Sequence, residues 1–257
     1  MEAFPIPGNG YTIRERLGSG NWKTAYRATS MHSAADVAIL YFHDVTMQKA
    51  FTGEVQAQLR AAKGHIYSDY IAEFKGLQHD DDGSWYIIEE LLARPLDKIG
   101  VVNDIVRFVR IARDLCRGLH CLHDNRLVHR DIKLDNCGLD HQERAKIFDL
   151  GLVTSDPQDV RGNIFTRSPE LFAAQGFLKG LRPKFSSDVW ALGATLYALR
   201  FGEYPFVHKS EIVERAQINI GVRDGTIDHK TATERKDRIR SEVQKRIEKK
   251  GAYERLA

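Results

Sequence analysis

Cysteines and long apolar runs are scarce in this sequence. Its 257 residues include three cysteines, Cys116, Cys121 and Cys137, with no CxxC pair among them. So small and odd a set excludes a disulfide framework and argues against a zinc site. It is typical of the reducing cytoplasm, where we expect the protein to be located. No apolar run approaches the roughly 18 residues of a membrane-spanning helix, so we expect no membrane partner.

Neither sign of charge is in large excess. The chain has 38 Lys and Arg residues against 35 Asp and Glu, a net charge of +3, which argues against a nucleic-acid partner. The exception is the segment 230–257, which has ten basic and five acidic residues. In that segment Ile239, Val243 and Ile247 are spaced by four, which predicts a helix with a narrow apolar stripe. Its polar face is either a solvated surface or a docking arm for a partner.

The first 90 residues contain five short apolar segments bounded by turn signals, which predict β-strands. The segments are residues 11–17, 24–28, 37–42, 71–77 and 85–91. Residues 48–62 contain few helix breakers and predict one helix. After Pro95 the apolar spacing changes to three and four, which predicts a helix with one buried stripe. The residues of this stripe are Ile105, Phe108, Ala112, Leu115, Leu119 and Leu122.

This order of elements predicts an α+β fold with two lobes. We expect an antiparallel, β-rich N-lobe with one helix at residues 1–92 and a helical C-lobe core at 93–207. Residues 208–257 would form an atypical, basic helical extension. Ligand sites are common where two lobes meet, so we expect the functional site in the cleft between them.

The segment 129–136, His-Arg-Asp-Ile-Lys-Leu-Asp-Asn, resembles the catalytic loop of protein kinases. The resemblance implies that Asp131 orients a substrate hydroxyl and that Asn136, five residues later, binds Mg²⁺. A surface loop with salt bridges is the alternative for this segment alone. Further matches follow in the same order as in kinases, at Asp149-Leu150-Gly151, Ser168-Pro169-Glu170 and residues 188–193. In this resemblance Asp149 is the second residue that binds Mg²⁺.

Lys133 bears on the type of substrate. A lysine two residues after the catalytic aspartate is typical of the Hanks-type Ser/Thr kinases, and the Ser-Pro-Glu element is typical of kinases that act on proteins. The resemblance therefore implies ATP as the phosphoryl donor and a protein as the acceptor. Many Ser/Thr kinases have a threonine at the position of Asn163. Its absence weakens the case for specificity toward serine and threonine hydroxyls, but we still favour a Ser/Thr kinase over a Tyr kinase.

The N-terminal segment 17–26 resembles the glycine-rich loop that covers the phosphates, with Gly18, Ser19 and Gly20 as its centre. Lys23 replaces the third glycine, and Leu40 replaces the lysine that kinases have in strand three. One interpretation is a pseudokinase or scaffold module that binds nucleotide or partners without catalysis. The other is a lysine relocated to position 23. This second arrangement is similar to that of the With-No-Lysine kinases, which also share Asp-Leu-Gly-Leu, here residues 149–152.

The same resemblance implies the other residues of the nucleotide site. Glu54, the only acidic residue between positions 44 and 69, would pair with Lys23. Ile88 would lie at the back of the adenine pocket, and residues 89–91 would form the hinge that reads adenine. Gly138 stands where kinases have a larger apolar floor. The expected pocket and hinge residues are Leu17, Ala25, Ala38, Glu89 and Leu91.

Three further expectations concern the regulation of the enzyme and whether this chain is part of a larger protein. Arg130 would bind a phosphate on Thr154 or Ser155 of the activation segment. A chloride ion held near Leu150 and Leu152 would inhibit the enzyme, as the With-No-Lysine resemblance implies. In kinases the glutamate at the position of Glu170 pairs with an arginine from a motif further along the chain, and this sequence lacks that motif. Either an arginine of the basic helix near 235–249 meets it, or the chain is one piece of a larger protein.

Overall fold

The computed structural model describes residues 10–19, 23–42, 48–61, 64–79, 85–153, 163–171 and 184–249. The chain divides into two units, each with its own contacts. The first unit contains residues 1–98, 109–129 and 135–155, and the second contains 99–108, 130–134 and 156–257. Among the described residues, no helix is both long and apolar enough to cross a membrane.

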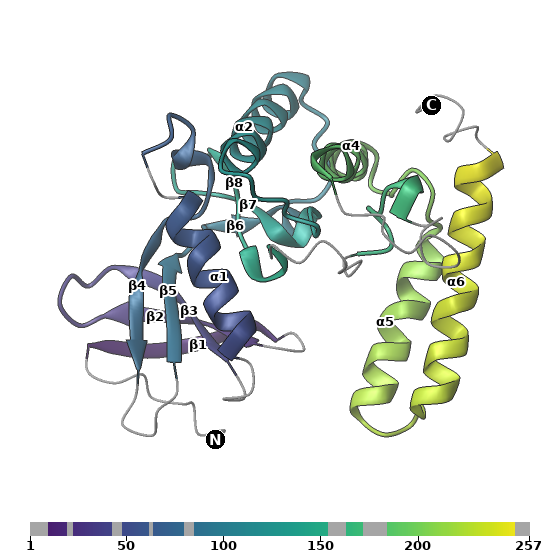
Figure 1. Cartoon of the computed structure of the whole chain (residues 1–257), viewed down its shortest axis with the longest axis horizontal. Coiled ribbons are helices and arrows are strands. Elements are labelled where there is room, and N and C mark those ends of the chain that lie inside the picture. The colour runs from purple at the N-terminus through teal and green to yellow at the C-terminus, as the bar shows by residue number, and fades with distance from the viewer. Residues whose placement is uncertain are drawn as a thin grey trace. The chain divides into compact units, whose positions relative to one another are not determined.

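A five-stranded antiparallel sheet forms the N-terminal part of the first unit (Figure 1). Its strands are β1 (Tyr11–Ser19), β2 (Lys23–Ser30), β3 (Asp36–Phe42), β4 (Phe74–His79) and β5 (Trp85–Glu90), in the order β1-β2-β3-β5-β4. The predicted fourth strand, residues 71–77, starts too early in the sequence. Ile71 is not part of this sheet and forms a bridge with Ile147 instead. The α+β fold class predicted from the sequence is confirmed.

Both faces of this sheet carry apolar residues, because β3 is central and buried on both sides. On one face Ile39 and Ile88 pack with Ala28, Val37 and Tyr86. On the other face Leu40, Phe42 and Ile87 pack against α1 (Gln48–Ala61). Helix α1 therefore lies on the same face of the sheet as Leu40, which is the face that carries the site described below.

The first unit is completed by a small second sheet and most of α2 (Ile105–Asp124). The sheet contains β6 (Arg94–Pro95), β7 (Cys137–Leu139) and β8 (Ala145–Ile147), and short 3-10 turns occur at η2 (Ser68–Tyr70), η3 (Leu96–Lys98), η4 (Leu134–Asn136) and η5 (Leu150–Leu152). The predicted stripe of α2 is buried at Leu115, Leu119 and Leu122, whereas Ile105 is exposed. The stripe instead begins at Ile111 and includes Gly118. Glycine is needed at 118, because the carbonyl oxygen of Tyr70 lies where a side chain would be.

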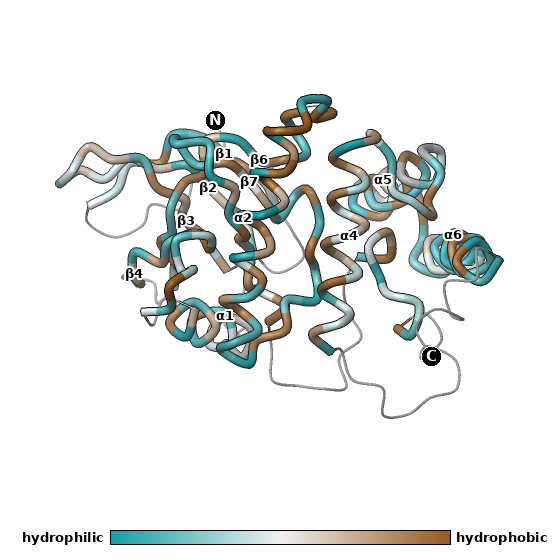
Figure 2. The backbone as a smooth tube through the Cα atoms, turned by 90° about the horizontal axis from the view of Figure 1, so that it is seen from above, coloured by the Kyte–Doolittle hydropathy of each residue, from teal (hydrophilic) through white to brown (hydrophobic). Residues whose placement is uncertain are grey.

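Three helices dominate the second unit: α4 (Phe185–Phe201), α5 (Lys209–Arg223) and α6 (His229–Lys249). Figure 2 shows that hydrophilic residues predominate along α6. Its predicted apolar stripe, Ile239, Val243 and Ile247, is nevertheless buried. These residues pack with Ile218 of α5 and Ile164, so the stripe joins two neighbouring helices to the segment 163–171.

Candidate active site

Lys23, Glu54 and Asp149 form one group of contacting charges in the first unit, here called the Lys23 cluster. Lys23 begins β2 and lies opposite Phe42 in the sheet. Its ammonium pairs with the carboxylate of Glu54 on α1, and its Nζ lies 2.9 Å from Oδ1 of Asp149. Burial opposes the charged form of Lys23, but the attraction of Asp149, Glu54 and Glu89 outweighs it and raises the pKa of Lys23. The lysine is therefore a permanent cation.

The turn at Asp149 shapes this cluster. Asp149 has a positive φ of 60°, and its Oδ1 accepts a hydrogen bond from the Gly151 N–H at 3.4 Å. The sharp turn thus lies at Asp149 itself. Gly151 matters for space, because a Cβ there would lie 3.0 Å from Oε2 of Glu54 and 3.4 Å from Nζ of Lys23. Any larger residue at 151 would push the Lys23 cluster apart.

Leu40 is an apolar residue, and its surroundings are apolar too. Leu40 is buried and packs with Phe42 and Ile87, and Ala25 and Val55 lie against the same group. A charged side chain at this position would need partners that these neighbours do not offer. Leu40 and Ala25 are opposite each other in the β2–β3 ladder, on the face of the sheet that carries Lys23.

Glu89 is the residue that the sequence-based interpretation misjudged. Opposed residues in a sheet point to the same side, and Glu89 lies opposite Ala38, whereas Ile88 lies opposite Ile39 on the other face. If Ala38 is a wall of the adenine pocket, Ile88 cannot be at its back, and the Glu89 side chain takes that place. Glu89 is buried and accepts a hydrogen bond from Nε2 of Gln58 at 3.0 Å.

Burial gives Glu89 unusual acid–base behaviour. Its pKa is raised to about 8, mainly by loss of water and also by the carboxylates of Glu54 and Asp149, against the opposing effect of Lys23. Burial likewise raises the pKa of Glu54 against the opposing effect of Lys23. With this pKa, Glu89 is mainly protonated at neutral pH, so Glu54 and Asp149 are the carboxyl groups that pair with Lys23. Their hard oxygen donors are suited to a divalent cation such as Mg²⁺.

The residues expected to bind Mg²⁺ lie on neighbouring strand ends of the first unit. Asn136 is buried at the end of the turn η4, directly before β7, and Asp149 follows β8. The N–H of Phe148, the residue before Asp149, donates to the carbonyl oxygen of Asn136 at 3.0 Å. An amide oxygen and a carboxylate are ligands that Mg²⁺ accepts, so this pair fits that ion.

Gly138 has a steric explanation in the structure. A Cβ at this position would lie 2.9 Å from Cδ1 of Leu92 and 3.1 Å from the carbonyl oxygen of Arg94. Leu92 therefore fills the space that a larger residue at 138 would take. The chain beside it is anchored by Glu90, whose carboxylate lies 2.8 Å from Nζ of Lys146.

Other expected nucleotide-site residues are less enclosed. Leu17 is half exposed at the end of β1, next to Gly18, and the Ser19 hydroxyl hydrogen-bonds to Thr24 at 2.9 Å. Leu91 follows β5 directly and is partly exposed. Gly20, Thr154 and Ser155 lie outside the described residues. Leu150 is buried and Leu152 is half-buried in the turn η5, where the Val153 N–H donates to the Leu150 carbonyl at 3.0 Å.

Asp131 is held by its neighbours in the second unit. Its Oδ2 lies 2.9 Å from Nζ of Lys133, and its Oδ1 accepts a hydrogen bond from the Asn163 N–H at 2.9 Å. Arg130 has a φ of 70°, and its N–H donates to Oδ1 of buried Asp188 on α4 at 2.8 Å. The backbone directly before Asp131 is thus held by Asp188, and the Asp131 carboxylate is held by Lys133 and Asn163.

Glu170 is not paired with the basic helix. It accepts a hydrogen bond from the Ser187 hydroxyl at 2.9 Å. Among the described residues, Arg235 and Arg238 of α6 pair with Glu214 of α5, and Arg246 pairs with Glu211. The expectation that an arginine near 235–249 meets Glu170 is therefore wrong, because the nearer acids of α5 take these arginines.

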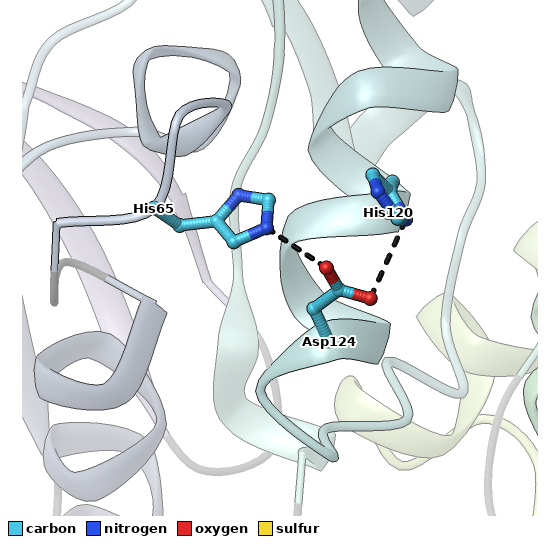
Figure 3. Close-up of side chains that lie close together, drawn as sticks. All are labelled: His65, His120 and Asp124. Carbon is cyan, nitrogen blue, oxygen red and sulfur yellow. Dashed lines mark hydrogen bonds and ion pairs between the residues drawn. The ribbon is translucent and has the colours of Figure 1, made fainter.

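A third polar cluster joins His65, His120 and Asp124 in the first unit (Figure 3). Oδ2 of Asp124 lies 3.0 Å from Nε2 of His65, and Oδ1 lies 3.6 Å from Nδ1 of His120. The Tyr67 N–H donates to Nδ1 of His65 at 3.2 Å, so in neutral His65 the proton is on Nε2 and points to Asp124. A metal ion on Nε2 would require the opposite tautomer. The geometry favours a hydrogen-bonded anchor between residues 65–67 and α2.

Comparison with known proteins agrees with this geometry. The family model described as the protein kinase domain matches residues 11–252. Serine/threonine-protein kinase ULK3 of Xenopus laevis is 28% identical over 211 residues, 78% of this chain and 44% of that protein. Serine/threonine-protein kinase PLK4 of Drosophila ananassae is 26% identical over 202 residues, 76% of this chain and 26% of that protein.

A bacterial relative is similar to the same extent. The DNA damage-responsive serine/threonine-protein kinase RqkA of Deinococcus radiodurans is 28% identical over 211 residues, 78% of this chain and 31% of that protein. The chain spans less than half the length of each of these three relatives. Because the family model covers nearly all of the chain, the chain belongs to the protein kinase family.

Proposed function

We propose that this chain is an ATP-dependent protein kinase that phosphorylates serine and threonine hydroxyls. The observation that carries the proposal is the Lys23 cluster, in which one cation meets a carboxylate of α1 and the aspartate of the Asp-Leu-Gly turn. Kinases need a lysine in this ionic environment to bind the ATP phosphates. The names of the relatives support Ser/Thr specificity.

In this proposal Lys23 takes the role that a strand-three lysine has in other kinases. Two observations support this role of Lys23. Leu40 is enclosed by apolar side chains, and the Lys23 ammonium reaches Glu54 and Asp149 from β2. Lys23 would therefore neutralise charge on the phosphates of ATP, and Glu54 would hold it in position.

The other residues have distinct roles in the proposed reaction. Asp131 orients the acceptor hydroxyl, whose oxygen bonds to the γ-phosphorus while the bond from that phosphorus to the β–γ bridging oxygen breaks. ADP leaves with the electron pair, the hydroxyl proton passes toward Asp131, and Lys133 stabilises charge on the transferred group. Asn136 and Asp149 would hold Mg²⁺, which neutralises charge on the phosphates.

The adenine site differs from the sequence-based expectation by one residue. We propose that Ala25 and Ala38 form its walls, with Leu17 and Leu91, and that the Glu89 side chain is at its back. The hinge that reads adenine through the backbone then begins at Glu90. This shift is supported by the pairing of Ala38 with Glu89 across β3 and β5.

A transfer assay tests the function. Purified chain is incubated with γ-labelled ATP, Mg²⁺ and a generic basic protein, and phosphoserine and phosphothreonine are measured after hydrolysis. The proposal predicts labelled phosphoserine or phosphothreonine in the protein. Binding of ATP without any transfer would support the alternative, a scaffold module that keeps the nucleotide site.

Chloride inhibition is a finer proposal, which rests on the With-No-Lysine resemblance. A halide beside the η5 turn would favour an arrangement in which Lys23 and Glu54 do not pair. In the described structure they do pair, so we expect chloride to slow autophosphorylation only a few-fold. The measurement holds ionic strength constant while gluconate replaces chloride, and equal rates at all chloride concentrations would contradict the proposal.

A further inference from the structure

Three arginines of the second unit lie near one another, on segments that share an apolar core. Arg167 belongs to the segment 163–171, Arg215 to α5 and Arg240 to α6; we call them the arginine cluster. The two helices lie side by side (Figure 1), and their apolar residues pack together with Ile164 of the segment. The guanidinium carbon of Arg215 lies over the Phe165 ring, 5.9 Å from its centroid, so α5 contacts the segment that carries Arg167.

These cations repel one another. Arg167 is 8% exposed, and burial together with the nearby charges of Arg240 and Arg215 lowers its pKa to about 10. Burial and Arg240 lower the pKa of Arg215 in the same way. Lys236 of α6 also has a lowered pKa, because of burial and of Arg215. Arg167 is thus buried, and the half-buried side chains of Arg215, Lys236 and Arg240 add positive charge to its surroundings.

Part of the hydrogen-bonding capacity here is unused. Nη1 of Arg215 and Nε of Arg240 are buried atoms without a hydrogen-bond partner among the described residues, and so is the hydroxyl of Ser168. Arg240 does donate through Nη1 to Oδ1 of Asp237 at 2.6 Å. Arg215 has no carboxylate partner in the described part of the chain. Buried donors without partners destabilise a fold, so packing alone does not account for the positions of Arg215 and Arg240.

The cluster lies close to the proposed acceptor site. The N–H of Asn163 donates to Asp131, and Arg167 follows Asn163 by four residues in the same segment. The Asp131 carboxylate acts electrostatically on Arg167 and opposes the effect of the two other arginines. A ligand of the arginine cluster would therefore be a near neighbour of a hydroxyl held at Asp131.

We propose that Arg167, Arg215 and Arg240 bind a phosphorylated residue of the protein substrate near the hydroxyl that receives the new phosphoryl group. This inference rests on the proposed kinase function. Guanidinium groups bind phosphate oxygens through pairs of N–H donors, and a phosphate group carries nearly two negative charges at neutral pH. A phosphoserine neutralises more of the cluster than an aspartate does, and an uncharged residue neutralises none of it.

Peptides with one acceptor serine test the proposal on the full chain. A second serine, an aspartate or a phosphoserine is placed at each position from four residues before to four residues after the acceptor. We expect kcat/KM to be at least tenfold higher for phosphoserine than for serine at one position, with aspartate between them. Equal kcat/KM for the three residues at every position would overturn the proposal.

Variants separate a binding role from a structural one. Arg215→Gln and Arg240→Gln should each bring the ratio of kcat/KM for phosphoserine and serine peptides close to one, and Arg215→Lys should keep part of it. Thermal unfolding should show no loss of stability in Arg215→Gln, because a buried charge is removed. Arg238→Gln, two residues from Arg240 and paired with Glu214, is the matched control and should keep the ratio.

Direct binding distinguishes failure of this proposal from failure of the kinase function. Calorimetric titration with the phosphopeptide and with inorganic phosphate requires no turnover. Phosphopeptide binding that Arg215→Gln weakens would support the cluster even if no peptide were phosphorylated. Binding of inorganic phosphate but not of the phosphopeptide would indicate a site for a free ion only and would overturn the proposal, and a preference that survives in both glutamine variants would do the same.

Discussion

The Lys23 cluster of the first unit and the arginine cluster of the second unit are opposite in charge. Around Lys23 the carboxyl groups of Glu54, Asp149 and Glu89 act on a single buried cation, and Glu89 is mainly protonated at neutral pH. Around Arg167 the charges of Arg215 and Arg240 add to its own, and Asp131 counteracts them. Each region therefore keeps an excess of one sign in a partly dry environment.

Excess charge that the chain itself does not neutralise indicates what each region can bind. The first region gains from a divalent cation, which the phosphates of a nucleotide would bring with them. The second region gains from an anion. A kinase brings both together during turnover, since it binds Mg²⁺ with ATP and an acceptor protein. The comparison is useful because substitutions in one unit should leave binding in the other unit intact.

We expect the largest loss of phosphoryl transfer from a substitution in the second unit. Asp131→Asn should reduce phosphoryl transfer by about 10³-fold or more, because the amide cannot accept the hydroxyl proton. ATP affinity should stay near the wild-type value, since Asp131 acts on the acceptor and not on the nucleotide. Single-turnover assays and titration with a fluorescent ATP analogue measure the two quantities. Equal transfer by Asp131→Asn would end the kinase hypothesis.

Lys23 gives the corresponding test in the first unit. Lys23→Met should lower turnover by about 10²-fold and weaken ATP binding, because the phosphates lose a cation. It also leaves Glu54 buried without its partner, so urea unfolding should show lower stability. Leu40→Lys in this background should restore a small part of the activity.

Lys75→Met is the matched control for the lysine test. Lys75 lies on β4 and pairs with exposed Glu73 at 2.8 Å, so its replacement should change neither turnover nor ATP affinity. If Lys23→Met behaves like this control, Lys23 is not the phosphate-binding lysine, while the family assignment of the chain stands.

Gly151 tests the spacing of the Lys23 cluster with a single methyl group. Gly151→Ala puts a Cβ 3.0 Å from Oε2 of Glu54, so this carboxylate must shift by a few tenths of an ångström within the Lys23 cluster. We expect roughly a tenfold loss of kcat, about 1.4 kcal/mol in the barrier. Gly193→Ala on α4 is the control, since no atom lies within 4 Å of its added Cβ. Its activity should be unchanged, with slightly higher stability. Equal kcat for both variants would show that the spacing does not limit turnover.

Short motifs made the fold and the residues of the Lys23 cluster predictable. The segment 129–136, the Asp-Leu-Gly turn and the exchange of Lys23 for Leu40 are local patterns. The last two single out Lys23 and Asp149, which lie in contact in the structure. The spacing of Ile239, Val243 and Ile247 likewise predicted a buried stripe. The catalytic and regulatory roles of the individual residues stay predictions.

Contacts that depend on packing between distant elements could not be predicted in this way. Arg215 and Arg240 belong to no motif, and they meet only because α5 and α6 share a core with residue 164. The direction of the Glu89 side chain could not be predicted for another reason. In a strand, a shift of one residue moves a side chain to the other face, so the choice between Ile88 and Glu89 depends on how β5 pairs with β3.

Glu89 provides the last test, with the smallest effect, and it concerns pH. Its folded-state pKa of about 8 is above the ordinary value of 4.5, so the folded chain binds a proton more tightly than the unfolded chain does. Its contribution to stability is complete below pH 4.5 and is lost as the pH rises toward 8. Urea unfolding should therefore show wild-type stability falling between pH 5.5 and 8.5, by at most a few kcal/mol. Glu89→Gln, which keeps a partner for Gln58 without the charge, should lose less stability over this range, and Glu73→Gln at the surface should follow the wild type. If Glu89→Gln and wild type lose stability in parallel, Glu89 titrates in its ordinary range and the charge excess around Lys23 is larger at neutral pH than the structure implies.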